Sequence, residues 1–393
     1  MEETSRFYRH VHRVQMRILV FAGLVAPETG ALNPLATSVY VNLAFATVSS
    51  VYIYTFVQDC LDARFNPGIT SELFSFVGFH LRFVYILSRR DKLGRMLEYV
   101  EGLWRGVTSE EKIHVRRFVR KASRLSVCYS GIILTTITLY VLSSQLPQWT
   151  AGSSNATVHR VLPYPFYVDV QSSPQYEILL GAQIVCLLTV TQTSICVDMA
   201  VAFLIMIACG HFRLIQVRLE RVARMIDESQ PDELENNAKD IRDHVKNCVA
   251  YHCEIIGFCG EIATLSSEIF IVELISTTYN LSLIGILLAG SMPFAEKFKF
   301  APVLFILATQ LFVCQYPPDL LLQESAGVAD AAYFVPPLRR DRFRIDTLLL
   351  ALLRRSQIPY QLLAGGQIKL NIESFGNMIR GAVSFFTVLR NFN

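Results

Sequence analysis

Charged residues are scarce in this chain of 393 residues. Asp, Glu, Lys and Arg together make up 18% of the residues, whereas hydrophobic residues make up 52%. A water-soluble protein of this length usually carries about a quarter charged residues. The mean hydropathy is +0.36, and the chain holds 26 Phe and 16 Tyr. These values exclude an ordinary soluble domain and predict a polytopic membrane protein.

Paired cysteines and a secretory leader are missing as well. The nine cysteines are scattered along the chain, and none forms a CxxC pair. Neither a disulfide framework nor a thiol redox motif is therefore expected. Residues 1–17 are basic and polar, and no short apolar core with a small-residue cleavage site follows them. We therefore expect no signal peptide.

Motifs of catalysis are also absent. The sequence contains no GxSxG, no HxxxxD and no Gly-rich phosphate loop, so we expect neither enzymatic activity nor a cofactor. His244, Cys248 and His252 are spaced to share one helical face, as zinc ligands could, but no second ligand pair completes a site. Buried packing without a metal is the expectation for them. A secondary transporter would show paired repeats, which this chain lacks.

Long apolar segments dominate what remains. A helix of about 20 apolar residues crosses the hydrocarbon core of a bilayer. Seven segments reach about this length: 36–57, 69–88, 125–146, 178–209, 255–290, 300–322 and 370–389. The predicted fold class is therefore an all-α membrane protein with seven transmembrane helices. The fourth and fifth segments exceed one bilayer thickness, so we expect both helices to project into the cytosol.

Basic residues are divided unevenly between the alternate connections. One side holds 29 Lys and Arg residues and the other side holds 4. Because basic connections stay in the cytosol, the N-terminus is predicted to be cytoplasmic and the C-terminus extracellular. The expected organisation is a cytoplasmic N-terminal segment, a bundle of six membrane helices, a cytoplasmic anchor segment and a last helix. These parts comprise residues 1–35, 36–322, 323–369 and 370–393.

One motif and two absences bear on this topology. Asn155 begins an Asn-Ala-Thr sequon in the longest connection assigned to the outside, which indicates glycosylation, although such sequons also arise by chance. A G-protein-coupled receptor would have its N-terminus outside. It would also show D/E-R-Y after the third span and NPxxY in the seventh, and both motifs are missing. Such a metabotropic receptor is kept only as the alternative.

The C-terminal third carries a family resemblance. It consists of a basic, Leu-rich helix, an R-S-Q-x-P turn, a Gly-rich connection, an N-x-E-S-F start and an S-F-F-T-V-L close. These motifs stand at 339–355, 354–359, 364–366, 371–375 and 384–389. The pattern resembles the end of insect odorant receptors. The T-Y-x5-Q-F close of the gustatory branch is absent, which leaves a gustatory-like channel as a weaker alternative. The longer second cytoplasmic loop and V-Q-L-K-like tail of the co-receptor are absent too.

The resemblance implies a function. Odour-tuned members of that family form odorant-gated, non-selective cation channels as heterotetramers with a co-receptor, in the plasma membrane of olfactory neuron dendrites. Their cytoplasmic helix ends form a shared anchor, and a split seventh helix lines the pore. The implied partners are the co-receptor, a small volatile odorant and membrane lipid, with no nucleic acid.

Polar and small residues recur along the last predicted helix. Asn377, Gly381, Ser384, Val388 and Asn391 follow one another at spacings of four and three, which places them on one stripe of a helix. Polar groups that face lipid are costly, so the stripe should face water or protein. A pore-lining face and a helix-packing face both satisfy this requirement. The family resemblance places the gate at Val388, with Asn391 and Phe392 toward the mouth.

Charged groups near the C-terminus need partners. Arg380 lies deep in the last span, and Glu373 or an acid of a neighbouring helix is the expected partner. The basic, Leu-rich helix at 339–355 is too short to span a bilayer. It is expected to pack in the cytosolic anchor, and a helix lying on the membrane surface is the alternative.

A small apolar ligand needs an aromatic and aliphatic cavity with a few hydrogen-bonding groups. The family resemblance places this cavity in the outer half of spans two, three, four and six. The candidates by depth are Phe76, Phe79, His80, Phe83, Thr136, Leu139, Tyr140, Ser143, Gln183, Ile184, Leu187, Phe300, Leu304 and Phe305. Each of them could instead pack a helix interface, and His80 could pair with Glu72 or with a neighbouring helix.

Overall fold

The structure is a computed structural model of the chain. It describes residues 24, 34–64, 66–151, 160, 162–164, 170–289, 294–337 and 345–392. Within the helices it leaves out the side chains of residues 34, 144, 146–151, 231–237, 289, 294–301, 385–386 and 388–392. The sequon at Asn155 lies outside the described residues.

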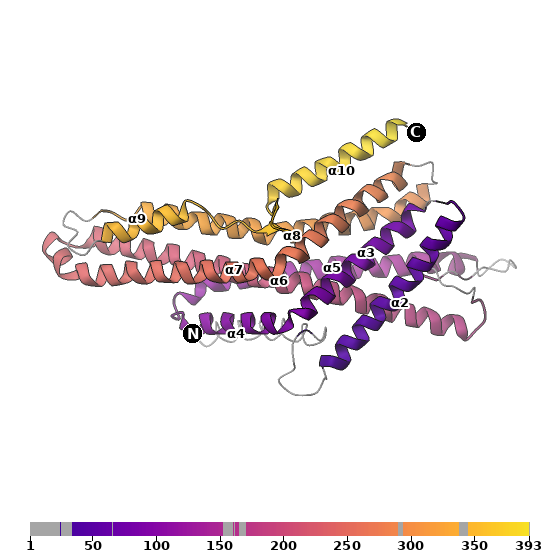
Figure 1. Cartoon of the computed structure of the whole chain (residues 1–393), viewed down its shortest axis with the longest axis horizontal. Coiled ribbons are helices and arrows are strands. Elements are labelled where there is room, and N and C mark those ends of the chain that lie inside the picture. Colours follow the sequence, from indigo (N-terminus) through magenta and orange to yellow (C-terminus); the bar gives the residue numbers. More distant parts are fainter. Residues whose placement is uncertain are drawn as a thin grey trace.

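Helices account for nearly all of the described chain (Figure 1). They are α2 (Pro34–Leu61), α3 (Pro67–Ser88), α4 (Arg90–Gly106), α5 (Lys112–Ala151), α6 (Gln175–Glu228), α7 (Pro231–Ala289), α8 (Phe294–Tyr333), α9 (Ile345–Ser356) and α10 (Ile372–Phe392). Each of the seven predicted spans lies within or largely within one of these helices. Two short antiparallel strands, β1 (Leu363–Ala364) and β2 (Ile368–Lys369), form a hairpin before α10.

Five of these helices are long and apolar enough to cross a membrane, as judged over the described residues: α2, α5, α6, α7 and α8. The other two predicted spans are α3 and α10, which carry more polar residues. In α3 the charged residues Glu72 and Arg82 lower the hydropathy, and Arg82 is turned inward and buried. An inward polar group satisfies the bilayer constraint without making the helix apolar overall.

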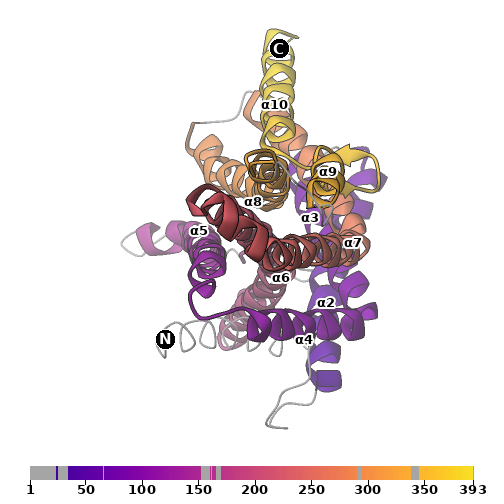
Figure 2. The ribbon, with the colours of Figure 1, turned by 90° about the vertical axis from the view of Figure 1, so that its left-hand side faces the viewer.

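The helix α6 forms the centre of the bundle, as Figure 2 shows. Its residues 199–212 are all buried, because α5, α7 and α8 all pack around it. A helix that is apolar on every side requires such surroundings. With 54 residues α6 is about 80 Å long, and α7 with 59 residues is about 90 Å long. Both helices are therefore much longer than a bilayer core of about 30 Å.

The helices begin and end at two opposite ends of the molecule (Figure 1). The turn from α6 to α7, the end of α8 and the start of α9 lie at one end. The turn from α2 to α3, the start of α6, the end of α7 and the start of α8 lie at the other end, with the end of α10. Which end faces the cytosol stays a prediction from the uneven distribution of Lys and Arg along the sequence.

The last helix begins with a local cap and then leaves the bundle. The Asn371 side chain accepts a hydrogen bond from the Ser374 amide at 2.8 Å, which satisfies a free donor at the start of α10. Just before it, Gly365 and Gly366 have φ values of +56° and +70°, which only glycine adopts without strain. This hairpin separates α9, which packs on α7 and α8, from α10. Figures 1 and 2 show α10 pointing away from the other helices.

Candidate functional site

Four aromatic side chains meet near the end of the bundle where α2 joins α3. Tyr52 of α2 stacks on Phe76 of α3 with ring centroids 5.2 Å apart, and Phe76 meets Phe79 edge-on at 6.4 Å. Tyr164, from the connection between α5 and α6, closes on Tyr52 at 6.0 Å. We call Tyr52, Phe76, Phe79 and Tyr164 the aromatic cluster. Tyr52, Phe76 and Tyr164 are buried, and Phe79 is half-buried.

Polar groups surround the aromatic cluster. The Tyr140 hydroxyl lies 3.2 Å from a Glu72 carboxylate oxygen and 2.8 Å from the Pro163 carbonyl oxygen. It has one proton to donate, so these two acceptors compete for it. The Gln183 amide holds the backbone of Tyr164 by donating to its carbonyl at 3.2 Å and accepting from its N–H at 3.4 Å. An apolar site with a few such groups suits a small ligand that carries a single polar function.

Four of the candidate residues come together here: Phe76, Phe79, Tyr140 and Gln183. Leu187 is buried one turn further along α6. The sequence reasoning did not find Tyr52, Glu72 and Tyr164 as parts of this site. Glu72 could have indicated this site from the sequence, because a carboxylate in an apolar span needs a partner. The hydroxyl partner, Tyr140, is 68 residues away in the sequence, and no local pattern connects the two.

His80 and Phe83 lie on a neighbouring face of α3 and contact α2. The His80 Nε2 atom is 3.1 Å from the Asn42 side-chain oxygen, and the imidazole stacks on Phe45 with centroids 5.0 Å apart. Phe83 packs on the same Phe45 ring at 5.8 Å. His80 is therefore paired with a neighbouring helix rather than with Glu72. In this arrangement both residues stabilise the α2–α3 interface.

The remaining candidates are dispersed. Thr136 donates to the Ile132 carbonyl and Ser143 to the Tyr140 carbonyl, both within α5. Leu139 and Phe305 are 51% and 59% exposed on the outside of the bundle. Ile184 and Leu304 are half-buried, and the Phe300 side chain is outside the described set.

A buried ion cluster lies one helical turn beyond Phe79. The Arg82 side chain is 1% exposed, and its Nη1 atom is 2.5 Å from both the Asp198 carboxylate of α6 and the Glu273 carboxylate of α7. Its Nη2 atom donates to Ser194 at 3.0 Å, and the Tyr129 hydroxyl of α5 donates to Asp198 at 3.0 Å. We call Arg82, Asp198 and Glu273 the ion cluster. It joins α3, α6 and α7 in the interior of the bundle.

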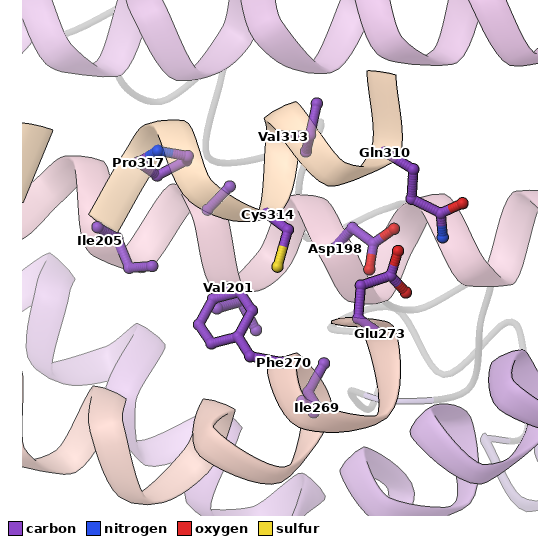
Figure 3. Close-up of a pocket in the computed structure, with 11 residues that line it drawn as sticks. Asp198, Val201, Ile205, Ile269, Phe270, Glu273, Gln310, Val313, Cys314 and Pro317 are labelled. Atoms are coloured by element: carbon purple, nitrogen blue, oxygen red, sulfur yellow. The ribbon is translucent and has the colours of Figure 1, made fainter. Parts of the chain in front are cut away.

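A small cavity adjoins the ion cluster (Figure 3). The carboxylates of Asp198 and Glu273 and the amide of Gln310 converge at one end, and the Cys314 sulfur points in from α8. Apolar side chains such as Phe270 line the rest. The space holds about one water molecule, so an odorant-sized ligand does not fit there.

A larger groove opens at the other end of the molecule, between α6, α7 and the corner from α4 to α5. Its volume is about 490 Å³, and charged and polar side chains such as Glu111, Arg218 and Glu254 line it. Such a lining does not suit a small apolar ligand. His244 and Cys248 also face this groove. Over the residues that the structure describes, no three His, Cys, Asp or Glu side chains gather as a metal ion would require.

The polar stripe of α10 faces away from the subunit's own bundle. Asn377, Gly381 and Ser384 are exposed, whereas Phe375 and Ile379, on the other side of the helix, pack against the core. The Arg380 guanidinium donates to the Asn377 side-chain oxygen at 2.5 Å, so its partner in this structure is on its own helix and is not Glu373. The side chains of Val388, Asn391 and Phe392 lie outside the described set.

Long apolar helices surround the aromatic cluster and the ion cluster, and this architecture can be compared with known membrane proteins. The family model described as 7tm Odorant receptor matches residues 70–383. The chain belongs to this family, whose members are receptors rather than enzymes.

Curated relatives agree with the family assignment. The chain is 27% identical to Odorant receptor 10 of Aedes albopictus over 288 residues, which cover 70% of each chain. It is 24% identical to Odorant receptor Or2 of Anopheles gambiae over 358 residues, which cover 86% of each chain.

A solved structure shows the same fold. The olfactory receptor OR5 of Machilis hrabei in complex with eugenol is similar with a TM-score of 0.74 at 13% identity. The similarity covers 98% of this chain and 100% of that one. The prediction of an all-α membrane protein with seven transmembrane helices is confirmed by this olfactory receptor fold.

Proposed function

We propose that this chain is the odorant-binding subunit of a non-selective cation channel that assembles with a co-receptor as a heterotetramer in the plasma membrane. The observation that carries the proposal is the aromatic cluster, a largely buried group of rings with Tyr140, Glu72 and Gln183 at its edge. An odorant is small, apolar and uncharged, and such a site recognises it by ring contact and one or two hydrogen bonds.

The exposed stripe of α10 supports the channel half of the proposal. If four subunits surround one axis with their α10 helices innermost, Asn377, Gly381 and Ser384 face water. The apolar Val388 then forms a ring further toward the mouth, beside Asn391 and Phe392, where it can stop ions by dewetting. A helix that used the stripe to pack on its own bundle would bury these residues, and three of them are exposed.

The remaining parts of the proposal concern placement. The N-terminus and the basic connections lie in the cytosol, the C-terminus lies outside, and Asn155 carries a glycan. Residues 323–369 form the anchor shared between subunits. The membrane is that of an olfactory neuron dendrite.

The experiment is current recording in cells that express this chain with an insect co-receptor, during application of an odorant panel. We expect a rapid cation current that requires both subunits. A slow response that a G-protein inhibitor abolishes would show the metabotropic alternative instead.

A matched pair of variants tests the site. Phe76 is 8% exposed within the aromatic cluster, whereas Phe74, two residues earlier, is 43% exposed and contacts Tyr279. Phe76→Ala should raise the half-maximal odorant concentration about tenfold or more, because it removes roughly 1.5–3 kcal/mol of apolar contact. Phe74→Ala should leave that concentration within about twofold, since a surface substitution changes energies by less than about 0.5 kcal/mol. Equal shifts in the two variants would place the odorant elsewhere.

A further inference from the structure

The ion cluster lies between the two parts of the molecule that the proposed function requires. On one side, Arg82 belongs to the same helix as Phe76 and Phe79. On the other side, Glu273 belongs to α7, which together with α8 carries α10. Asp198 ties the same arginine to the central helix α6.

The ion cluster is connected to the aromatic cluster by a direct contact. The Arg82 guanidinium lies 5.2 Å from the centre of the Phe79 ring, as in a cation–π interaction. The rings of the aromatic cluster touch one another, so an odorant that inserts between them must displace at least one. Displacement of Phe76 or Phe79 moves α3, or changes the surface on which the Arg82 head group rests.

The connection from the ion cluster to α10 passes through α7. Glu273 accepts a hydrogen bond from the Thr277 hydroxyl at 3.1 Å, which fixes the carboxylate on its own helix. Less than two turns earlier, the Ser267 carbonyl accepts from the Gly365 amide at 3.1 Å. A shift of α7 at Glu273 is therefore passed to the hairpin from which α10 starts.

The charges of the ion cluster allow the Arg82–Asp198 and Arg82–Glu273 ion pairs to be tested separately. One guanidinium faces two carboxylates, and a buried pair needs only one of each sign. Removing one acid leaves a neutral ion pair, whereas removing Arg82 leaves two carboxylates without a counter-charge. The acids can therefore be neutralised one at a time without creating an unpaired buried charge.

We propose that the Arg82–Glu273 ion pair is a positioning contact that holds α7, and with it α10, in the arrangement of this structure until an odorant displaces the aromatic cluster. This inference rests on the proposed channel function. The Arg82–Asp198 pair has a different role, because α6 is not a main support of α10. It fixes α3 to the centre of the bundle in both states.

The test compares two isosteric variants, Glu273→Gln and Asp198→Asn, expressed with the co-receptor. Asp198→Asn weakens the charge-assisted hydrogen bond from Arg82, and Glu273→Gln removes the charge of the ion-pair contact with Arg82. Glu273→Gln should lower the half-maximal odorant concentration about threefold to tenfold and raise the current without odorant, relative to the amount of channel at the cell surface. Asp198→Asn should leave both quantities within about twofold of the unmodified channel, because α6 is not a main support of α10.

Equal shifts in the two variants, or no shift in Glu273→Gln, would overturn the proposal. If Glu273→Gln does not reach the surface, Thr277→Val provides the second test. It removes one hydrogen bond that holds the Glu273 carboxylate without changing charge, and it should shift sensitivity in the same direction by a smaller factor. An unchanged sensitivity in Thr277→Val would then contradict the inference. The unmodified channel distinguishes a failure of this inference from a failure of the proposed function. If the unmodified channel gives no odorant current, the proposed function itself is contradicted.

Discussion

At the scale of single residues, polar groups inside the spans find one another across distant parts of the chain. Arg82 and Asp198 are 116 residues apart in the sequence, and Tyr140 meets Glu72 from another helix. Sequence patterns indicate that each of these residues needs a partner, because an unpaired polar group in a bilayer is costly. They do not indicate which partner, since the pairing depends on how the helices are arranged.

A second residue pair stabilises the end of the bundle where α4 turns into α5. The Arg218 guanidinium donates twice to the Glu111 carboxylate, with both distances at 2.9 Å. This ion pair, together with the Thr108 amide that also donates to Glu111, holds the pKa of Glu111 down at about 2. The Arg218 guanidinium also rests 4.9 Å above the Tyr251 ring.

Glu111→Ala should therefore destabilise the protein by about 3 kcal/mol, because it leaves a partly buried arginine without its counter-charge. Glu110→Ala is the matched control, since Glu110 is the exposed neighbour and its loss should cost less than about 0.5 kcal/mol. Thermal unfolding of the purified protein in detergent measures both changes. A similar loss in the two variants would mean that the ion pair contributes nothing.

The same pair predicts a pH dependence. The folded-state pKa of Glu111 lies below its ordinary value of 4.5, so its contribution to stability is present above pH 4.5 and is lost as the pH falls toward 2. The difference in unfolding temperature between the unmodified protein and Glu111→Ala should be constant from pH 8 to about pH 5.5 and should shrink below pH 4.5. A difference that grows on acidification would contradict the assigned cause.

At the scale of elements, the hairpin before α10 tolerates little change. A Cβ atom on Gly365 would come within 3.0 Å of Ile271 on α7, whereas a Cβ atom on Gly366 would meet nothing within 4 Å. Both glycines have positive φ. The two positions therefore share the backbone strain and differ in the steric clash.

Gly366→Ala should cost roughly 1–2 kcal/mol of stability from the strained backbone alone. Gly365→Ala should cost clearly more, because the clash pushes the hairpin away from α7 and weakens the Gly365–Ser267 hydrogen bond. Thermal unfolding and the amount of protein at the cell surface are the measurements. The test is which variant loses more stability. A larger loss in Gly366→Ala than in Gly365→Ala would show that the hairpin does not pack on Ile271.

Elements were the part of the fold that the sequence could predict best. Apolar length is a local property, so all seven spans were found, although the helices extend further than the apolar windows. The window at 178–209 became the longer helix Gln175–Glu228 because residues of its polar extension, such as Leu214, Leu219 and Val222, are buried against neighbouring helices. The site was found only partly, because Tyr52 and Tyr164 reach it from segments whose local pattern says nothing of a ligand.

At the scale of the whole molecule, the turn from α6 to α7 and the start of α6 lie at opposite ends (Figure 1). An epitope tag inserted between Ser229 and Gln230, in the turn from α6 to α7, should be detected only after cells are permeabilised. A tag inserted between Gln171 and Ser172 should be detected on intact cells. The reason is the retention of basic connections in the cytosol. The reverse result would invert the topology and remove the main argument against a G-protein-coupled receptor.

The length of α6 has one more consequence. A rigid rod of about 80 Å acts as a lever: a tilt of about 3° at a pivot near one end moves the other end by about 4 Å. Gln183, beside the aromatic cluster, sits near one tip, and the turn to α7 forms the other. If the far tip is clamped, small rearrangements around a bound molecule become displacements large enough to open or close a narrow passage. If it is free, the same motion is not transmitted to the rest of the molecule.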